Sequence, residues 1–86
     1  MNISKNEQRV LHVLSQGGEI RHRRGENGKI VAVRCFTHDG NVLSNCTLPL
    51  FKRLLRRRLI HSTGGKPYRA SHLGRTVVRA QLDNRT

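Results

Sequence analysis

Cationic side chains gather in the second half of this sequence, at the spacing of one helix face. Guanidinium and ammonium groups bind phosphates and carboxylates through charge-assisted hydrogen bonds. A surface that serves solubility alone usually mixes both signs of charge, and this face has no interspersed acid. We therefore interpret it as a contact for a polyanion or an acidic protein, with a merely solvated helix face as the alternative. Its members are Lys52, Arg53, Arg56 and Arg57, which we expect to point to solvent on the outer face of the helix.

A short basic turn follows this helix. Gly64 and Gly65 provide the positive φ angles of a tight reversal. From such a turn, Lys66, Tyr68 and Arg69 could reach phosphates or a protein partner, with an ordinary tight hairpin as the alternative. Tyr68 has a second and favoured interpretation, because in a chain with three aromatic residues it can pack in the core against the last helix. The predicted binding surface consists of Lys52, Arg53, Arg56, Arg57, Lys66, Tyr68 and Arg69.

The remaining polar residues predict no catalytic site. The 5 acidic residues are scattered, and no catalytic triad order, paired carboxylates, phosphate loop or nucleotide fingerprint is present. A metal-independent ribonuclease is an alternative, because His61, Tyr68 and His72 could transfer protons near the basic turn. A lone histidine on a basic surface is more often only solvated. We therefore predict a protein that is not an enzyme and needs no cofactor.

Two cysteines raise the question of a metal site. Cys35, His38 and Cys46 have the spacing C-x2-H-x7-C, which could hold part of a zinc site if His22 or His61 completed it. No second closely spaced ligand pair supports that site, and His38 falls in a turn-like stretch. In a reducing compartment, buried free thiols are the ordinary state of such cysteines. We predict no metal.

Length and charge bound the possibilities further. Eighty-six residues allow one domain with a modest core. Residues 44–86 carry 10 basic side chains and 1 acidic side chain, so the electropositive surface lies in this half. No run approaches the roughly 20 apolar residues that span a bilayer, and the first residues lead into a helix signal instead of a signal peptide. These features predict a cytoplasmic protein without a membrane contact.

Capping residues and glycines divide the chain into elements. Ser4 and Glu7 form a capping box, Thr47 and Ser71 are N-cap residues, and Gly17 can end the first helix in a left-handed conformation. Alternating polar and apolar residues predict strands between these helices. The predicted elements are a helix over 5–16, strands over 19–24 and 29–36, a helix over 47–59, strands over 60–63 and 66–70, and a helix over 72–82.

The pattern also predicts which side chains are buried. Arg21, Arg23 and Arg24 make the first strand too polar for a central position, so we expect it at an exposed edge. In the last helix, Ala80 should face inward and Arg75 outward. Arg58 falls near the apolar side of the preceding helix, so its charged group should reach solvent at the helix end. The predicted core consists of Val10, Leu11, Leu14, Val33, Phe51, Leu54, Leu55, Ile60, Leu73 and Val77.

This order of elements predicts a fold class. The order α-ββ-α-ββ-α is that of an α+β, winged helix-turn-helix-like single domain covering residues 1–86, with the basic turn as the wing. A full helix-turn-helix needs a helper helix before the recognition helix. Residues 37–46 are short and turn-rich for that role, so we expect an incomplete DNA-reading unit.

Several motifs together resemble the YjhX-type family of small bacterial toxins. They are RCFTHDG at 34–40, LFKRL at 50–54, GGKPYR at 64–69 and VRAQLDNR at 78–85. The resemblance covers nearly the whole chain. It implies a winged-helix-like toxin of a toxin-antitoxin pair, with a cognate antitoxin and with a nucleic-acid enzyme such as DNA topoisomerase I as its target. A winged-helix DNA-binding regulator is the alternative, and we expect any binding of DNA to be weak and sequence-tolerant.

Overall fold

The computed structural model describes residues 2–83, and it describes side chains for residues 2–79. The described chain contains three helices and two antiparallel sheets, which confirms the predicted α+β class. The elements follow the order α1 (Lys5–Ser15), β1 (Glu19–Arg24), β2 (Ile30–Phe36), β3 (Val42–Leu43), α2 (Leu48–Arg56), β4 (Ile60–His61), β5 (Arg69–Ala70) and α3 (His72–Asp83).

Local signals at both ends of α1 act as the sequence predicts. The backbone N–H of Glu7 donates to Ser4 Oγ at 3.1 Å, and the backbone N–H of Ser4 donates to Glu7 Oε1 at 3.2 Å, which completes the capping box. At the other end, Gly17 adopts a φ of 100°. Its N–H donates to the carbonyl of Leu14, and that of Gly18 donates to the carbonyl of Val13, so α1 ends in a Schellman motif.

Strands β1 and β2 form the predicted hairpin, and a third strand joins them. In β3, Val42 lies opposite Phe36 and Leu43 lies opposite Cys35. The sequence pattern does not indicate this strand, because it spans only two residues beyond a tight turn at residues 37–40. Strand β1 is the outer strand of the sheet, as predicted, except at Ile20, where two backbone hydrogen bonds join it to Tyr68.

Helix α2 begins as predicted but ends earlier. Thr47 Oγ1 accepts from the backbone N–H of Leu50 at 3.3 Å, which caps the helix. Arg58 then adopts a φ of 60°, a left-handed conformation that ends the helix in place of the more usual glycine. The predicted helix over 47–59 is therefore too long. Arg58 is exposed just beyond the helix end, which agrees with the predicted exposure of its charged group there.

The hairpin after α2 has shorter strands than predicted. Strands β4 and β5 pair over two residues each, and residues 62–68 form the connection between them. Gly64 and Gly65 have φ angles of 61° and 78°, and the N–H of Lys66 donates to the carbonyl of Thr63. The tight glycine reversal is thus confirmed, while Pro67, which has no N–H to donate, lies in the part of the connection outside the ladder.

A close contact of Gly74 sets the rotation of α3. Ser71 caps this helix through its side chain, as predicted, by accepting from the N–H of Gly74 at 3.0 Å. A Cβ atom at Gly74 would overlap the carbonyl oxygen of Leu59, so only glycine allows this approach. The buried residues are consequently Gly74, Val77 and Val78, and the predicted inward position of Leu73 is wrong. The predicted position of Ala80 lies outside the described side chains.

One apolar cluster joins all three helices and both sheets. Most of the predicted core is confirmed, but Leu55 and Leu73 are 37% and 42% exposed. Leu55 lies outside because Leu50, Phe51 and Leu54 already form the narrow stripe that α2 buries. The buried members are Val10, Leu11, Leu14, Ile20, Cys35, Cys46, Leu50, Phe51, Leu54, Leu59, Ile60, Tyr68, Ala70, Val77 and Val78.

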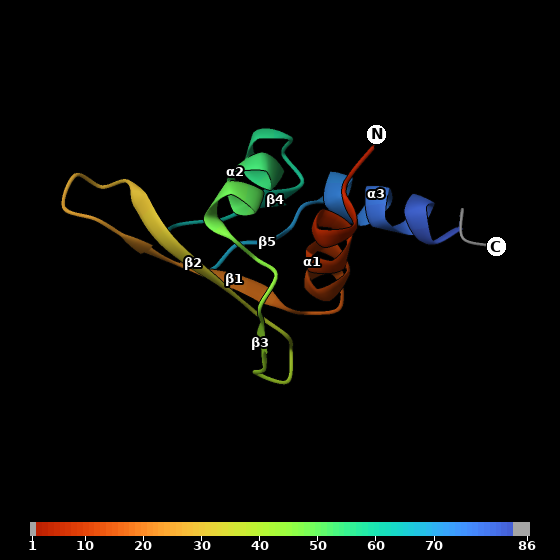
Figure 1. The fold of residues 1–86 in the computed structure, drawn as a ribbon, viewed down its shortest axis with the longest axis horizontal. Coiled ribbons are helices and arrows are strands. Elements are labelled where there is room, and N and C mark those ends of the chain that lie inside the picture. Colours follow the sequence, from red (N-terminus) through yellow and green to blue (C-terminus); the bar gives the residue numbers. More distant parts are fainter. Residues whose placement is uncertain (1, 84–86) are drawn as a thin grey trace.

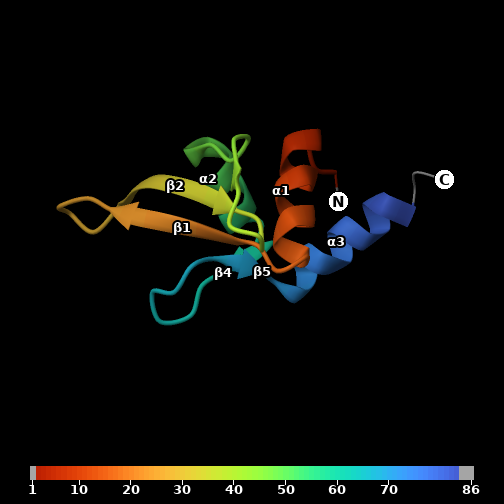
Figure 2. The ribbon, with the colours of Figure 1, turned by 90° about the horizontal axis from the view of Figure 1, so that it is seen from below.

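The elements separate into a helical end and a projecting end. Helices α1 and α3 pack together, and the tip of the β1–β2 hairpin projects away from them (Figures 1 and 2). Within residues 2–83, no helix lies between β2 and α2, where a helix-turn-helix would place its helper helix. Strand β3 and its turns occupy that part of the chain. The winged arrangement therefore stays a prediction.

Candidate functional site

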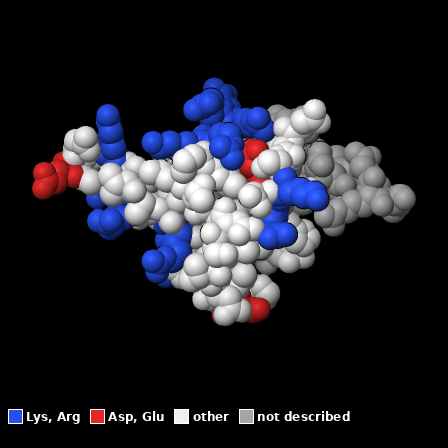
Figure 3. Space-filling view, viewed as in Figure 1, with Lys and Arg blue, Asp and Glu red and all other residues white. Residues whose placement is uncertain are grey.

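Lys and Arg side chains gather around α2 and around the β1–β2 hairpin (Figure 3). On α2 they form two rows, each with a spacing of four residues. One row contains Lys52 and Arg56, and the other contains Arg53 and Arg57. Residues four apart lie above one another on a helix, so the two rows face different directions.

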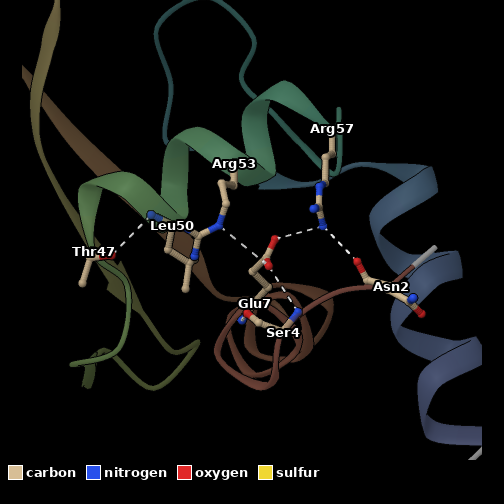
Figure 4. Close-up of polar contacts among 7 residues, drawn as sticks. All are labelled: Asn2, Ser4, Glu7, Thr47, Leu50, Arg53 and Arg57. Atoms are coloured by element: carbon tan, nitrogen blue, oxygen red, sulfur yellow. Dashed lines mark hydrogen bonds and ion pairs between the residues drawn. The ribbon is translucent and has the colours of Figure 1, made fainter.

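The row of Arg53 and Arg57 faces a carboxylate of α1 (Figure 4). Glu7 is the buried charged residue of the described chain, with its side chain 4% exposed. Arg57 Nη1 donates to Glu7 Oε2 at 3.4 Å and to the backbone oxygen of Asn2 at 3.0 Å. Arg53 Nε lies 3.9 Å from Glu7 Oε1. One buried carboxylate thus receives two guanidinium groups and also closes the cap of α1.

This geometry corrects the prediction that Arg53 and Arg57 point only to solvent. Their side chains are 45% and 38% exposed, and both engage the carboxylate of Glu7. A buried carboxylate without a cationic partner costs several kcal/mol by general estimates. The two arginines therefore hold α2 against α1. The capping box predicted the position of Glu7. No local signal indicated that Arg53 and Arg57, about 50 positions away in the sequence, would contact its carboxylate.

The row of Lys52 and Arg56 has no such anchor. Both side chains are exposed, and neither forms an ion pair with any side chain among residues 2–79. Of the four predicted cations of α2, these two are the ones left for an external partner. We call Lys52 and Arg56 the free row of α2.

The two predicted wing cations also differ: Arg69 is paired with an acidic residue, and Lys66 is exposed. Arg69 Nη2 lies 3.4 Å from Glu19 Oε1, and Arg69 Nη1 donates to the carbonyl of Gly17 at 3.3 Å, so Arg69 links β5 to the start of β1. Lys66 is exposed beside a cavity of about 160 Å³ that His61, Thr63, Pro67 and Arg69 also line.

Tyr68 belongs to the core, as the favoured interpretation expected, and its ring contacts lie on α2 and β1. Its ring meets Phe51 edge to face at a centroid distance of 5.0 Å and His22 at 5.2 Å. The residue is 8% exposed, so it offers little surface to a partner. Its burial also removes one of the three side chains of the ribonuclease alternative, and it leaves His61 and His72 exposed on β4 and α3.

The two halves of the predicted surface do not form one face. In Figure 2, α2 and the connection at residues 62–68 lie on opposite sides of the β1–β2 hairpin. A partner that contacts the free row of α2 would therefore meet Lys66 only by reaching around that hairpin.

The cysteines and His38 do not assemble a metal site. Cys35 and Cys46 are free and buried, whereas His38 is exposed and lies 2.9 Å from Asp39. The hydrogen bond with Cys46, together with burial, raises the pKa of Cys35, and the same bond lowers the pKa of Cys46. Within residues 2–79, no three His, Cys, Asp or Glu side chains are grouped to hold a metal ion.

These features define a class: a small, strongly basic α+β protein whose exposed cations suit an anionic partner. The family can be stated more closely. A family model described as "Putative toxin of bacterial toxin-antitoxin pair" matches residues 1–85, and the chain belongs to this YjhX toxin family, as the motifs indicated. The description implies an antitoxin as partner, and no catalytic enzyme family is indicated.

Relatives of similar length support this assignment. A UPF0386 protein of Beijerinckia indica is 62% identical over 85 residues, which are 99% of this chain and 100% of the relative. UPF0386 proteins of Brucella anthropi and Aliivibrio fischeri are 60% and 54% identical, with the same coverage. No solved structure matches the chain. None of the helices described is long and apolar enough to cross a membrane.

Proposed function

We propose that this protein is a toxin that binds and inhibits an enzyme acting on nucleic acid, with DNA topoisomerase I as the first candidate. The observation that carries the proposal is the free row of α2, Lys52 and Arg56, which is exposed without an acidic partner within residues 2–79. Enzymes that hold DNA or RNA have their own phosphate-binding grooves, and acidic side chains elsewhere on them are natural contacts for such a row.

The proposed action requires contact and no chemistry. Exposed charges act mainly through the rate of encounter and through specificity, so inhibition should weaken as salt rises. A cognate antitoxin would then neutralise the toxin by covering the same cations. The proposal includes a winged arrangement, in which α2 is followed by the β4–β5 connection. This arrangement would hold the exposed cations at the surface.

A charge reversal on α2 tests the proposal. We expect Lys52→Glu with Arg56→Glu to remove growth inhibition and to lower inhibition of topoisomerase I in a plasmid-relaxation assay by at least about tenfold, which is about 1.4 kcal/mol. The fold should persist, because neither side chain is buried or paired with a described acid.

The chain offers a matched control on α1. Lys5 and Arg9 are also exposed and four residues apart, so Lys5→Glu with Arg9→Glu makes the same change in net charge. This control should keep most of the inhibition. If both double variants lose inhibition equally, net charge acts instead of the α2 row. If the α2 variant is folded and fully inhibitory, the proposed surface is wrong.

The second candidate is a winged-helix DNA-binding regulator, which the position of α2 before a hairpin favours. A regulator needs tight binding to one operator, and the free row of α2 could read guanine but has no Asn or Gln that would read adenine. Purification of bound proteins with and without nuclease separates the two. A partner protein retained after nuclease treatment supports the inhibitor, and tight, salt-insensitive binding of one DNA sequence supports the regulator.

The proposal also states that the protein is not a ribonuclease. His61 and His72 are the exposed side chains that such chemistry would need, while Tyr68 is buried. We expect His61→Ala with His72→Ala to retain toxicity and to leave cellular RNA uncut, as in the wild type. Loss of both toxicity and RNA cleavage in this variant would establish the enzyme instead.

A further inference from the structure

The outer face of the β1–β2 hairpin carries a second basic surface. In the antiparallel register Arg21 lies directly opposite Arg34, and Arg23 lies opposite Ala32. Because side chains alternate between the two faces of a strand, Arg21, Arg23 and Arg34 share one face. All three are exposed. We call these residues the hairpin arginines.

This face points away from the core and from α2. The residues between the hairpin arginines face the other way: the ring of His22 contacts Tyr68, and Tyr68 in turn contacts Phe51 of α2. Cys35, which follows Arg34, is fully buried. The hairpin itself projects beyond the helices (Figures 1 and 2). The hairpin arginines are therefore separate from the free row of α2.

The charge on this face is poorly compensated. Arg21 Nε donates to Glu19 Oε2 at 2.8 Å, and the Arg21 guanidinium lies 4.5 Å from the centroid of the Phe36 ring. Arg23 and Arg34 form no ion pair or side-chain hydrogen bond with a residue in the described range. Like charges directly opposite each other destabilise a sheet. An anion bound between them would offset that repulsion.

The shape of the face also suits an anion. A cavity of about 250 Å³ is lined by the hairpin arginines together with Ala32 and Phe36, which share their face, and also by His22 and Val33 from the intervening positions. The small side chain of Ala32 leaves space beside Arg23. No acidic residue lines this cavity, and an arginine fork can bind phosphate oxygens in pairs.

We propose that the hairpin arginines bind the phosphate backbone of duplex DNA. The major groove of a duplex accommodates a two-stranded ribbon, and this hairpin is such a ribbon with its cations on one face. Single-strand binding relies on exposed aromatic side chains on which bases stack. Here Phe51 and Tyr68 are buried, and Arg21 covers Phe36. The proposed contacts are to phosphates, which every DNA sequence presents, so we expect binding that is independent of sequence.

This site goes beyond the proposed function. The free row of α2 would contact a protein, whereas the hairpin would contact DNA on another side of the molecule. A toxin with both surfaces could hold an enzyme and its DNA together. Binding of DNA at the hairpin does not depend on the identity of the protein target.

Titration of a short labelled duplex at several salt concentrations tests the site. We expect Arg23→Gln with Arg34→Gln to weaken binding by about tenfold or more and to lower the slope of log affinity against log salt by about 2, because each arginine would neutralise one phosphate. Lys5→Gln with Arg9→Gln removes the same charge from α1 and should preserve the slope. Circular dichroism melting checks that both remain folded. The single variant Arg23→Gln, with a slope change of about 1, replaces the double variant if that one unfolds.

Three results would overturn the proposal. The first is a hairpin variant that binds with wild-type affinity and slope. The second is an α1 control that loses as much affinity as the hairpin variant. The third is a single strand of the same sequence that outcompetes the duplex. Lys52→Glu with Arg56→Glu distinguishes this site from the proposed function. If it loses inhibition yet binds DNA through the hairpin, both proposals stand. If it keeps inhibition, only the proposed function fails.

Discussion

At the junction of α1 and α2, two arginines contact a buried carboxylate, whereas in the β1–β2 hairpin two arginines lie directly opposite each other. Arg53 and Arg57 therefore stabilise the packing of α2 on Glu7. Arg21 and Arg34 share a face on which Glu19 is the acidic neighbour. The same side-chain type thus holds the fold in one region and stays exposed on the surface in the other. Counting charges in a sequence cannot separate these two roles.

The largest effect should come from the core beneath the junction. Leu54 is fully buried, while its neighbour Leu55 is 37% exposed. We expect Leu54→Ala to lower the free energy of unfolding by about 2 to 5 kcal/mol, because it leaves a cavity. Leu55→Ala should cost less than about 1 kcal/mol. Urea denaturation of both variants measures this difference, and equal losses would mean that α2 is rotated about its axis.

The second-largest effect should come from reversing the charge of two arginines, and we compare this change at the junction of α1 and α2 with the same change in the β1–β2 hairpin. Arg53→Glu with Arg57→Glu places two carboxylates beside the buried Glu7, so we expect a loss of about 3 kcal/mol. Arg23→Glu with Arg34→Glu should change stability by less than about 0.5 kcal/mol, because it replaces two exposed cations that have no partner in the described chain. Thermal melting compares the two. Equal melting temperatures would show that the junction arginines are not structural.

A smaller effect should follow removal of the central charge alone. Glu7→Gln keeps a side chain that can accept from Ser4 but loses the negative charge that Arg53 and Arg57 contact. Because both arginines can turn to solvent, we expect a loss of about 1 to 2 kcal/mol. This loss should shrink when Arg53 and Arg57 are also changed to Gln, and a double-mutant cycle measures the coupling. Fully additive losses would contradict the contact.

The smallest effect is a gain at the end of α2. Arg58 holds a left-handed conformation that glycine adopts without strain, so Arg58→Gly should raise the free energy of unfolding by about 0.5 to 1 kcal/mol. Lys52→Gly, inside the same helix, should instead lower it by about 1 kcal/mol. Chemical denaturation should therefore give changes of opposite sign in the free energy of unfolding, which would confirm the left-handed conformation of Arg58. A loss at Arg58 would indicate that its side chain contributes more than its backbone strain costs.

The sequence predicted features that depend on neighbouring residues. The capping box of Ser4 and Glu7, the caps of Thr47 and Ser71 and the glycine reversal at Gly64 and Gly65 all form as expected. Each depends on hydrogen bonds or φ angles within about four residues. The hairpin over β1 and β2 and the family also followed from the sequence.

The candidate surface was less predictable. Sequence reasoning identified Arg53 and Arg57 as a solvent-facing pair, but their partner Glu7 lies on another helix. Arg69 similarly binds Glu19, which is far away in the sequence. Arg34 was not selected as part of a basic surface, because only the register of β1 and β2 places it opposite Arg21.

By itself, the sequence determined where the helices begin, where the chain reverses and that cations far outnumber acids, because these properties are local or additive. Only the tertiary structure decided which cations are neutralised and that Gly74 instead of Leu73 faces the core. The physical reason is that burial and ion pairing depend on the element that packs opposite each residue. The approach of Gly74 to Leu59 and of α2 to Glu7 joins residues that are distant along the chain.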